Sequence, residues 1–171
     1  MSLFKVREWW QTNCGMDEEF DRKSLCIGNL DNDFRNPNYK IATGSFSGYL
    51  RMYFPQRKGA RPEDMLLEQH LGFPILQIAF GKFIPNETKY KALAVLHPRK
   101  FVVYNVMVKG NDKDNKYYQL QKLYEHTLHR TAFNFVYGQF GGVYDKDHVC
   151  VQSVDGCLTF FEQNTFSFNR F

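Results

Sequence analysis

Apolar and polar residues alternate most clearly over Val149–Phe161, whose sequence is VCVQSVDGCLTFF. Val149 and Val151 alternate with Cys and Gln neighbours, and the second half of the segment repeats the alternation. A period of two is typical of half-buried strands. Asp155 and Gly156 lie between the two halves, and an Asp-Gly pair supplies the positive φ angles that a tight turn needs. The segment therefore predicts a β-hairpin.

The same hairpin pattern recurs along the chain at a regular distance. Ile41–Tyr53 aligns with Val149–Phe161 without a gap, and Gly48 occupies the position of Gly156. Midway between these two hairpins lies Leu93–Tyr104, which is one residue shorter in its turn. Three evenly spaced copies give a period of about 54, which indicates a repeat protein.

A second pattern, apolar-x-apolar-Gly-x-apolar, keeps nearly the same spacing. It occurs three times, at Leu25–Leu30, Ile78–Phe83 and Phe135–Phe140. Its glycines, at positions 28, 81 and 138, therefore stay in step with the hairpins. The segments Leu66–Leu71 and Leu123–Leu128 also match each other, and the second glycine is separated from the third by the same distance. Each repeat therefore contains a strand that ends at glycine, a loop, a hairpin and a fourth strand.

Four strands in about 50 residues are typical of one blade of a β-propeller. A β-solenoid would have a much shorter repeat, and a β-sandwich would not repeat its sequence. We therefore predict an all-β chain in which residues 23–171 form part of a propeller, with antiparallel blades at about 24–71, 74–128 and 132–168. Propellers close with about four to eight blades. We expect apolar sheet faces at both ends of three blades to make the isolated chain self-associate.

Residues 1–22 precede the first predicted blade and contain an apolar pattern of Leu3, Phe4, Val6, Trp9 and Trp10. The segment could form a short amphipathic helix or an extended strand, and it could act as a clasp that completes another blade. Its two tryptophans either pack within the chain, which we favour, or form an exposed anchor for a partner.

Composition narrows the class of partner. The net charge is +4 with acids and bases interspersed, which favours no nucleic-acid partner. Basic residues cluster only in two predicted loops, at 57–61 and at Arg99–Lys100, where solvated turns explain them. No apolar run approaches the ~20 residues that span a bilayer, and the first residues do not resemble a secretory signal. The four cysteines form no CxxC pair and no extracellular disulfide framework, which predicts a reducing, intracellular compartment.

Three groups of residues have the types that bind metal ions, but not the full pattern. Asp112, Asp114 and Asn115 lack the central Gly and terminal Glu of a calcium loop. Asp31–Asp33 follows a strand, and a solvated turn explains it better because the other repeats lack these acids. His126 and His129 lie on or after a strand, where a spacing of three places side chains on opposite faces. We therefore predict no metal site.

Residues with catalytic potential have equally simple structural explanations. Glu125 matches Glu68 in the repeat, so a structural pairing role is expected. Ser45 and Ser153 share one position in the hairpin, but neither belongs to a GxSxG motif. The glycine-rich run 138–142 is not followed by a helix that could bind phosphate. We therefore predict no catalytic residue, no cofactor-binding residue and no cofactor.

Six segments carry a resemblance to a known family: LFKVREWW at Leu3–Trp10, LCIGNLDN at Leu25–Asn32, GSFSGYLRMY at Gly44–Tyr53, LAVLHPRK at Leu93–Lys100, YEHTLHRTAFNFVYGQFGGV at Tyr124–Val143 and VQSVDG at Val151–Gly156. They resemble the N-terminal part of the Bardet–Biedl syndrome 9 family, also called parathyroid hormone-responsive B1, over residues 1–171. Tyr124–Val143 is the most specific of the six, because it belongs to no general propeller signature.

The resemblance implies the first three blades of a seven-bladed propeller, with the family's later blades and its ear-like, platform and helical regions missing. It also implies a non-enzymatic scaffold subunit of the BBSome, a coat complex that moves membrane proteins into and out of cilia. Its partners would be other BBSome subunits, with indirect membrane association through the coat. The expected locations are the cytoplasm, the cilium, the ciliary membrane and the centrosome or basal body. The alternatives are a peptide-binding propeller outside the BBSome and a propeller hydrolase.

Overall fold

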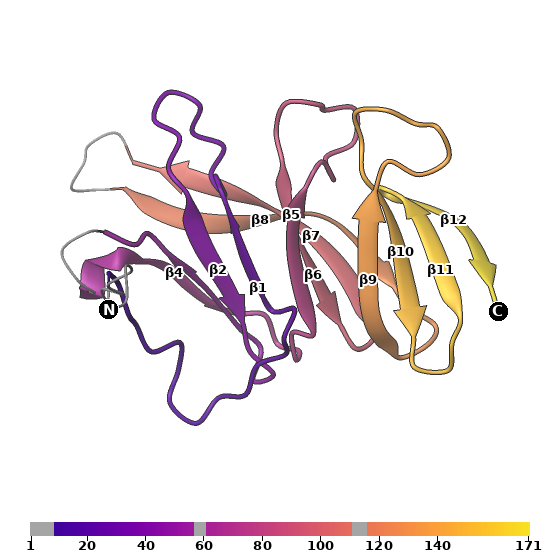
Figure 1. Cartoon of the computed structure of the whole chain (residues 1–171), viewed down its shortest axis with the longest axis horizontal. Coiled ribbons are helices and arrows are strands. Elements are labelled where there is room, and N and C mark those ends of the chain that lie inside the picture. The colour runs from indigo at the N-terminus through magenta and orange to yellow at the C-terminus, as the bar shows by residue number, and fades with distance from the viewer. Residues whose placement is uncertain (1–8, 57–60, 111–115) are drawn as a thin grey trace, which may run out of the picture.

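The computed structural model describes residues 9–56, 61–110 and 116–171. Twelve strands form three four-stranded antiparallel sheets that follow one another along the chain and lie side by side (Figure 1). The first sheet contains β1 (Leu25–Gly28), β2 (Lys40–Gly44), β3 (Tyr49–Tyr53) and β4 (Met65–His70). The second contains β5 (Gln77–Gly81), β6 (Ala92–His97), β7 (Lys100–Lys109) and β8 (Tyr117–Thr127). The third contains β9 (Ala132–Gly138), β10 (His148–Ser153), β11 (Leu158–Glu162) and β12 (Thr165–Arg170).

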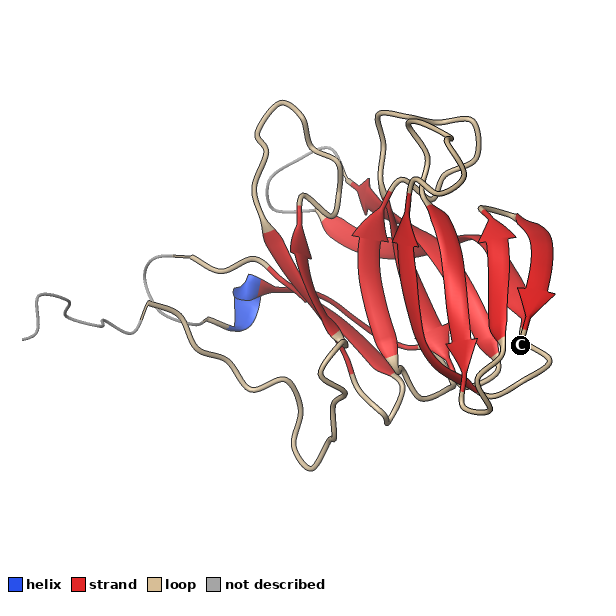
Figure 2. Cartoon of the chain, turned by 45° about the vertical axis from the view of Figure 1, so that its right-hand side comes forward, coloured by secondary structure: helices blue, strands red, loops and turns tan. Residues whose placement is uncertain are grey.

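The order of the strands confirms the prediction of an all-β chain with three four-stranded blades. Within each sheet, neighbouring strands are consecutive in the sequence, as in a propeller blade. Among the described residues the only helical element is η1, a 3-10 turn at Pro62–Asp64 (Figure 2). We refer to the sheets as the first, second and third blades.

The hairpin turns explain why the first and third blades share a sequence pattern. Gly156 has φ +88° and Gly48 has φ +87°, so both occupy the left-handed region that favours glycine. Ser153 accepts a hydrogen bond from the N–H of Gly156 through its carbonyl (3.0 Å), and Ser45 does the same for Gly48 (3.0 Å). The expectation that Asp155 also has a positive φ is wrong, and its carboxylate instead accepts a hydrogen bond from the Ser153 hydroxyl.

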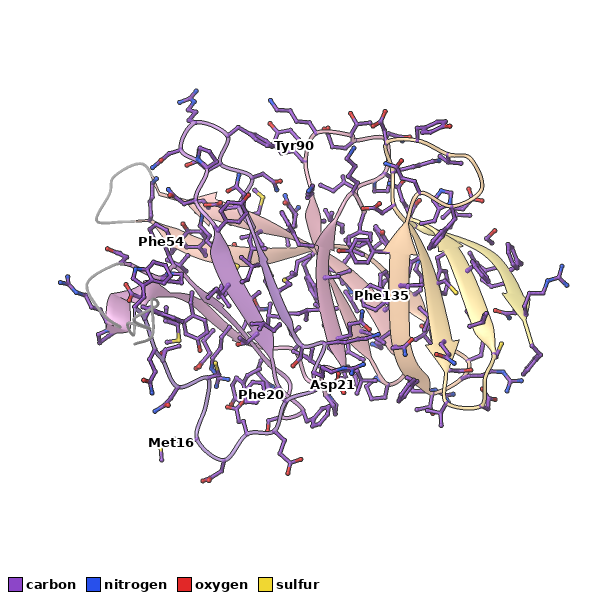
Figure 3. All side chains as sticks on the ribbon, viewed as in Figure 1. Met16, Phe20, Asp21, Phe54, Tyr90 and Phe135 are labelled. Atoms are coloured by element: carbon purple, nitrogen blue, oxygen red, sulfur yellow. The ribbon has the colours of Figure 1, made fainter. Side chains whose placement is uncertain are left out.

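Two apolar clusters fill the spaces between the blades. The first joins the first and second blades, and the second joins the second and third. Strand β6 contributes to both, because Leu93 and Val95 belong to the first cluster, whereas Ala94 and Leu96 belong to the second. Figure 3 shows Phe135, which is 1% exposed, at the boundary of the second and third blades. The central blade is therefore buried on both faces.

The repeated glycine at the end of each first strand has a steric reason. A Cβ atom at Gly28 would lie 2.7 Å from the Phe80 ring on the second blade. A Cβ atom at Gly81 would lie 2.8 Å from the Asp147 carboxylate on the third blade. Wherever another blade follows, its close approach requires the absence of a side chain at this position.

Residues 9–22, which we call the strap, contain neither a helix nor a strand, so both predicted conformations are wrong for this part of the segment. Trp10 packs its ring edge-on against Tyr53 (5.8 Å between centroids) and donates a hydrogen bond from Nε1 to Asp64 (3.0 Å). Trp10 therefore packs within the chain, whereas Trp9 is 56% exposed. Leu3, Phe4 and Val6 lie outside the described residues.

Candidate interaction surfaces

The third blade has one face against which no other sheet of the described residues packs. Its centre is a row of apolar side chains that runs across all four strands, in the order Val136, Cys150, Phe160 and Phe168. The rings of Phe160 and Phe168 stack at 4.5 Å with an interplanar angle of 22°. Val136 is 54% exposed and Phe168 is 45% exposed. We call this row the third-blade face.

The equivalent row on the second blade packs against a neighbouring blade. There the paired residues are Ala79, Ala94, Val103 and Tyr124, and these pack against the third blade. Ala94 and Val103 have no exposed surface at all. The third-blade face therefore carries the row equivalent to the one by which the second blade packs against its neighbour, with Val136 and Phe168 exposed at its edges and Cys150 only 8% exposed. A surface of this kind can pack against a further sheet or against another protein.

The opposite end of the molecule differs, because the strap lies against the outer face of the first blade. The guanidinium of Arg51 donates two hydrogen bonds to Glu18 of the strap (2.7 and 2.9 Å) and one to Glu68 (2.6 Å). The side chains of Arg51 and Glu18 are only 8% and 10% exposed. Hydrogen bonding from Arg51 lowers the pKa of Glu18, and this outweighs the opposite effect of burial. Leu25 and Ile27 on β1 stay exposed at this end.

The Asp31–Asp33 loop is more than the solvated turn that was predicted. Asp31 forms a buried ion pair with Lys40 (2.7 Å), and the two side chains are 6% and 5% exposed. Asn32 exchanges two hydrogen bonds with the backbone of Lys91 on the second blade (2.9 Å each). Asp33 accepts hydrogen bonds from backbone N–H groups of the loop itself. The carboxylates of Asp31 and Asp33 therefore stabilise the loop through an ion pair and hydrogen bonds. The described residues contain no cluster of three potential metal ligands.

The two histidines of the HxxH pattern do not form a pair. His126 stacks on Phe161 at 4.1 Å and makes a hydrogen bond through Nε2 with the Gln163 carbonyl (2.7 Å). Burial lowers the pKa of His126, although this hydrogen bond partly opposes the shift. His129 lies beyond the end of β8 and is exposed. His126 therefore has a packing role at the junction of two blades.

The remaining described candidate residues also take part in ion pairs or turns. Glu68 binds Arg51 and Glu125 binds Lys122 (2.9 Å), which fits the predicted pairing role. Ser45 and Ser153 shape their hairpin turns, as described above. In the glycine-rich run, Gly141 and Gly142 have positive φ in a turn that no helix follows. Residues 112, 114 and 115 lie outside the described residues.

The cysteines fit the repeat only partly. Cys26 and Cys150 lie on strands, whereas Cys157 lies in the turn before β11. All four described cysteines are free thiols. Burial raises the pKa of Cys26 to about 12, so this thiol is a packing residue at neutral pH.

Comparison with known proteins identifies the family. The family model described as PTHB1 N-terminal matches residues 1–171, the whole chain. This chain belongs to the PTHB1 N-terminal family. It is 48% identical over 176 aligned residues to Protein PTHB1 of Mus musculus, 47% identical to that of Xenopus laevis and 48% identical to that of Homo sapiens. The alignments cover 100% of this chain but 20% of each relative, so the chain spans about a fifth of their length.

The fold of this PTHB1 N-terminal chain also has a solved counterpart. The crystal structure of BBS1N in complex with ARL6DN matches it with a TM-score of 0.58 over 88% of this chain and 39% of the other, at 14% identity. BBS1N is a β-propeller, so the three sheets are propeller blades. The resemblance and the fold class predicted from sequence are both confirmed. In the part of the PTHB1 N-terminal chain that the structure describes, no helix is long and apolar enough to cross a bilayer.

Proposed function

We propose that this chain is a non-enzymatic docking part of a BBSome subunit that serves ciliary membrane-protein traffic and cilium assembly. The observation that carries the proposal is its membership of the PTHB1 N-terminal family, with 48% identity to the human relative over the whole chain. In this role the blades present surfaces to other coat subunits, and membrane association is indirect, through the coat. The corresponding locations are the cytoplasm, the cilium, its membrane and the basal body region.

Two structural observations support a docking role. The described side chains with catalytic potential are engaged in ion pairs, turns or blade packing, whereas the third-blade face exposes the apolar side chains of Val136 and Phe168. In addition, BBS1N, which shares the fold, has been crystallised in complex with ARL6DN. A propeller of this kind can therefore bind a protein partner.

The proposal is tested by affinity purification from ciliated cells. A tagged full-length PTHB1-family protein that contains this chain is compared with one that lacks residues 1–171. We expect the intact protein to co-purify with other BBSome subunits and to concentrate at cilia by fluorescence microscopy. We expect the deletion to lose at least one of those subunits. The proposal is wrong if the intact protein brings down no BBSome subunit.

A further inference from the structure

A pocket of about 270 Å³ opens in the cleft between the second and third blades. Ligand sites for small molecules usually have about 300–1,000 Å³, so this pocket suits an amino-acid side chain better than a large cofactor. Leu128, which follows β8, forms part of one wall. Phe161 on β11 and Phe166 on β12 form part of the other.

The interior of the pocket is mostly apolar and held in place by stacking. The imidazole of His126 lies almost parallel to the Phe161 ring, with an interplanar angle of 16°. Phe166 packs edge-on against Phe161 at 6.1 Å and is itself 54% exposed. Thr159 and Asn169 add neutral polar groups to the lining. An apolar side chain would thus find an aromatic wall and a few hydrogen-bonding groups.

Positive charge lies at one end of the pocket. A second hollow adjoins it through His129 and Arg130, and Arg99 and Asp155 line that hollow. Arg130 is paired with Asp155, but within the described residues Arg99 has no ion-pair partner. None of the residues that line the first pocket is acidic. The two hollows together, which we call the junction groove, therefore favour a ligand with a carboxylate beside an apolar group.

One wall of the groove comes from a segment that carries the resemblance to the family. The residues from His126 to Arg130 lie at the start of the Tyr124–Val143 segment, which belongs to no general propeller signature. The side chains of His129 and Arg130 are exposed. The groove therefore combines an apolar pocket with exposed polar and basic side chains.

We propose that the junction groove binds an extended peptide segment that carries an apolar side chain followed by acidic residues. The apolar side chain enters the pocket beside Phe161 and Phe166, and the acidic residues lie against Arg99, since Arg130 is already paired with Asp155. β12 is the outer edge strand of its blade, and edge strands are surfaces to which extended segments can bind. This site goes beyond the proposed function, because the groove could bind or fail to bind peptides whether or not the longer protein joins the coat.

The test selects ligands for the purified chain from a phage-displayed library of random linear peptides. We expect the enriched peptides to share an apolar residue with Asp or Glu within the next few positions. The best peptide is then synthesised with a fluorescent label, and its affinity is measured by anisotropy. Raising the salt concentration should weaken binding, because the contacts of Arg99 are exposed.

Four variants locate the binding site. Arg99→Glu should weaken binding roughly fivefold, as expected when an exposed charge contact is reversed, and Phe166→Asp should weaken it about tenfold or more. Lys109→Glu is the matched control for charge, because Lys109 is an exposed residue at the other end of β7. Tyr144→Asp is the control for loss of an aromatic ring, since Tyr144 is 80% exposed. Both controls should leave the affinity unchanged.

Several results would overturn the proposal. One is the absence of enriched peptides, and another is the enrichment of basic peptides. A third is binding that neither groove variant weakens while circular dichroism shows both to be folded. If Phe166→Asp abolishes self-association of the chain and no peptide binds, the groove is a contact between copies and the proposal is wrong.

Discussion

The side-chain amide of Gln77 makes two hydrogen bonds with the backbone of Phe135. Its Nε2 donates to the Phe135 carbonyl at 2.8 Å, and its Oε1 accepts from the Phe135 N–H at 3.0 Å. Gln77 lies on β5 and Phe135 on β9, so these bonds join the innermost strands of two different blades. Both residues are buried, which means that water cannot replace either bond. The second and third blades are therefore held by a polar link as well as by their apolar cluster.

Removing this link should destabilise the chain. Gln77→Leu leaves the N–H and C=O of Phe135 buried without partners, and we expect a loss of about 2–3 kcal/mol in the free energy of unfolding. Urea denaturation followed by circular dichroism measures the loss. Gln119→Leu at an exposed position of β8 is the control and should change little. Equal midpoints for the two variants would show that the link contributes nothing.

Replacing Glu18 should release the strap in a pH-dependent way. The pKa of Glu18 is lowered in the folded chain, so its ion pair with Arg51 stabilises the chain above the ordinary carboxyl pKa of about 4.3. We expect Glu18→Gln to cost about 2 kcal/mol at pH 7. The difference from wild type should shrink as the pH falls through the lowered pKa.

Chemical denaturation at several pH values between 7 and 3 measures this difference. Glu19→Gln is the control, because Glu19 is an adjacent exposed residue of the strap. If the cost of Glu18→Gln is the same at every pH, the ion pair does not account for the stability of the strap.

Two histidines, the buried His97 and the half-buried His126, should make the chain less stable in mild acid. Burial lowers the pKa of His97 and of His126, so both bind protons more readily when the chain is unfolded. The free energy of unfolding should therefore fall as the pH decreases below about 6.5, the ordinary pKa of histidine. The decrease in the free energy of unfolding should be complete once the pH is below the lowered pKa values of both histidines.

Histidine titration by NMR, in folded chain and in urea, measures the two pKa values directly. His126→Phe keeps an aromatic ring against Phe161 but cannot titrate, so it should reduce the loss of stability between pH 7.5 and 5.5. His129→Phe is the control at an exposed position. A loss of stability that His126→Phe leaves unaltered would contradict the assignment.

The repeated glycines should respond differently to substitution. Gly28→Ala brings a methyl group to 2.7 Å from the Phe80 ring, and such overpacking costs about 1–3 kcal/mol. Gly138→Ala meets only Phe140 of its own blade, at an ordinary 3.6 Å. It should be neutral, or stabilise the chain by up to about 1 kcal/mol through the lower entropy of the unfolded state. Thermal unfolding compares the two, and similar melting temperatures would contradict the close approach of blades as the reason for the repeat.

The sequence was sufficient to predict the blades because each blade repeats local signals. The alternating strands and glycines such as Gly28 recur with a nearly fixed spacing. Each of these patterns determines the conformation of residues close to it in the sequence, so it can be recognised without the structure. The link between Gln77 and Phe135 could not be found in this way, since Ser24 and Asn134 occupy the equivalent positions in the other blades. It depends on two residues 58 positions apart in the sequence.

The polar contacts of the strap could not be predicted for a similar reason. Glu18 and Arg51 are 33 positions apart, and nothing in the local pattern connects them. The apolar residues around Trp9 and Trp10 predicted packing alone. The structure adds an ion pair between Glu18 and Arg51 and a hydrogen bond from Trp10 to Asp64, which also hold the strap against the first blade. The buried pair of Asp31 with Lys40 was hidden because acids in a turn usually face solvent.

Sedimentation velocity of the purified chain and of Phe168→Asp tests most directly the claim that the third-blade face is a surface for docking. Phe168 lies on an edge strand and is 45% exposed, so this variant adds a charge to the face with little effect on folding. We predict that the wild-type chain associates as its concentration rises, that Phe168→Asp stays monomeric, and that Tyr144→Asp behaves like wild type. A wild-type chain that stays monomeric at every concentration, or a Phe168→Asp variant that still associates, would contradict the claim.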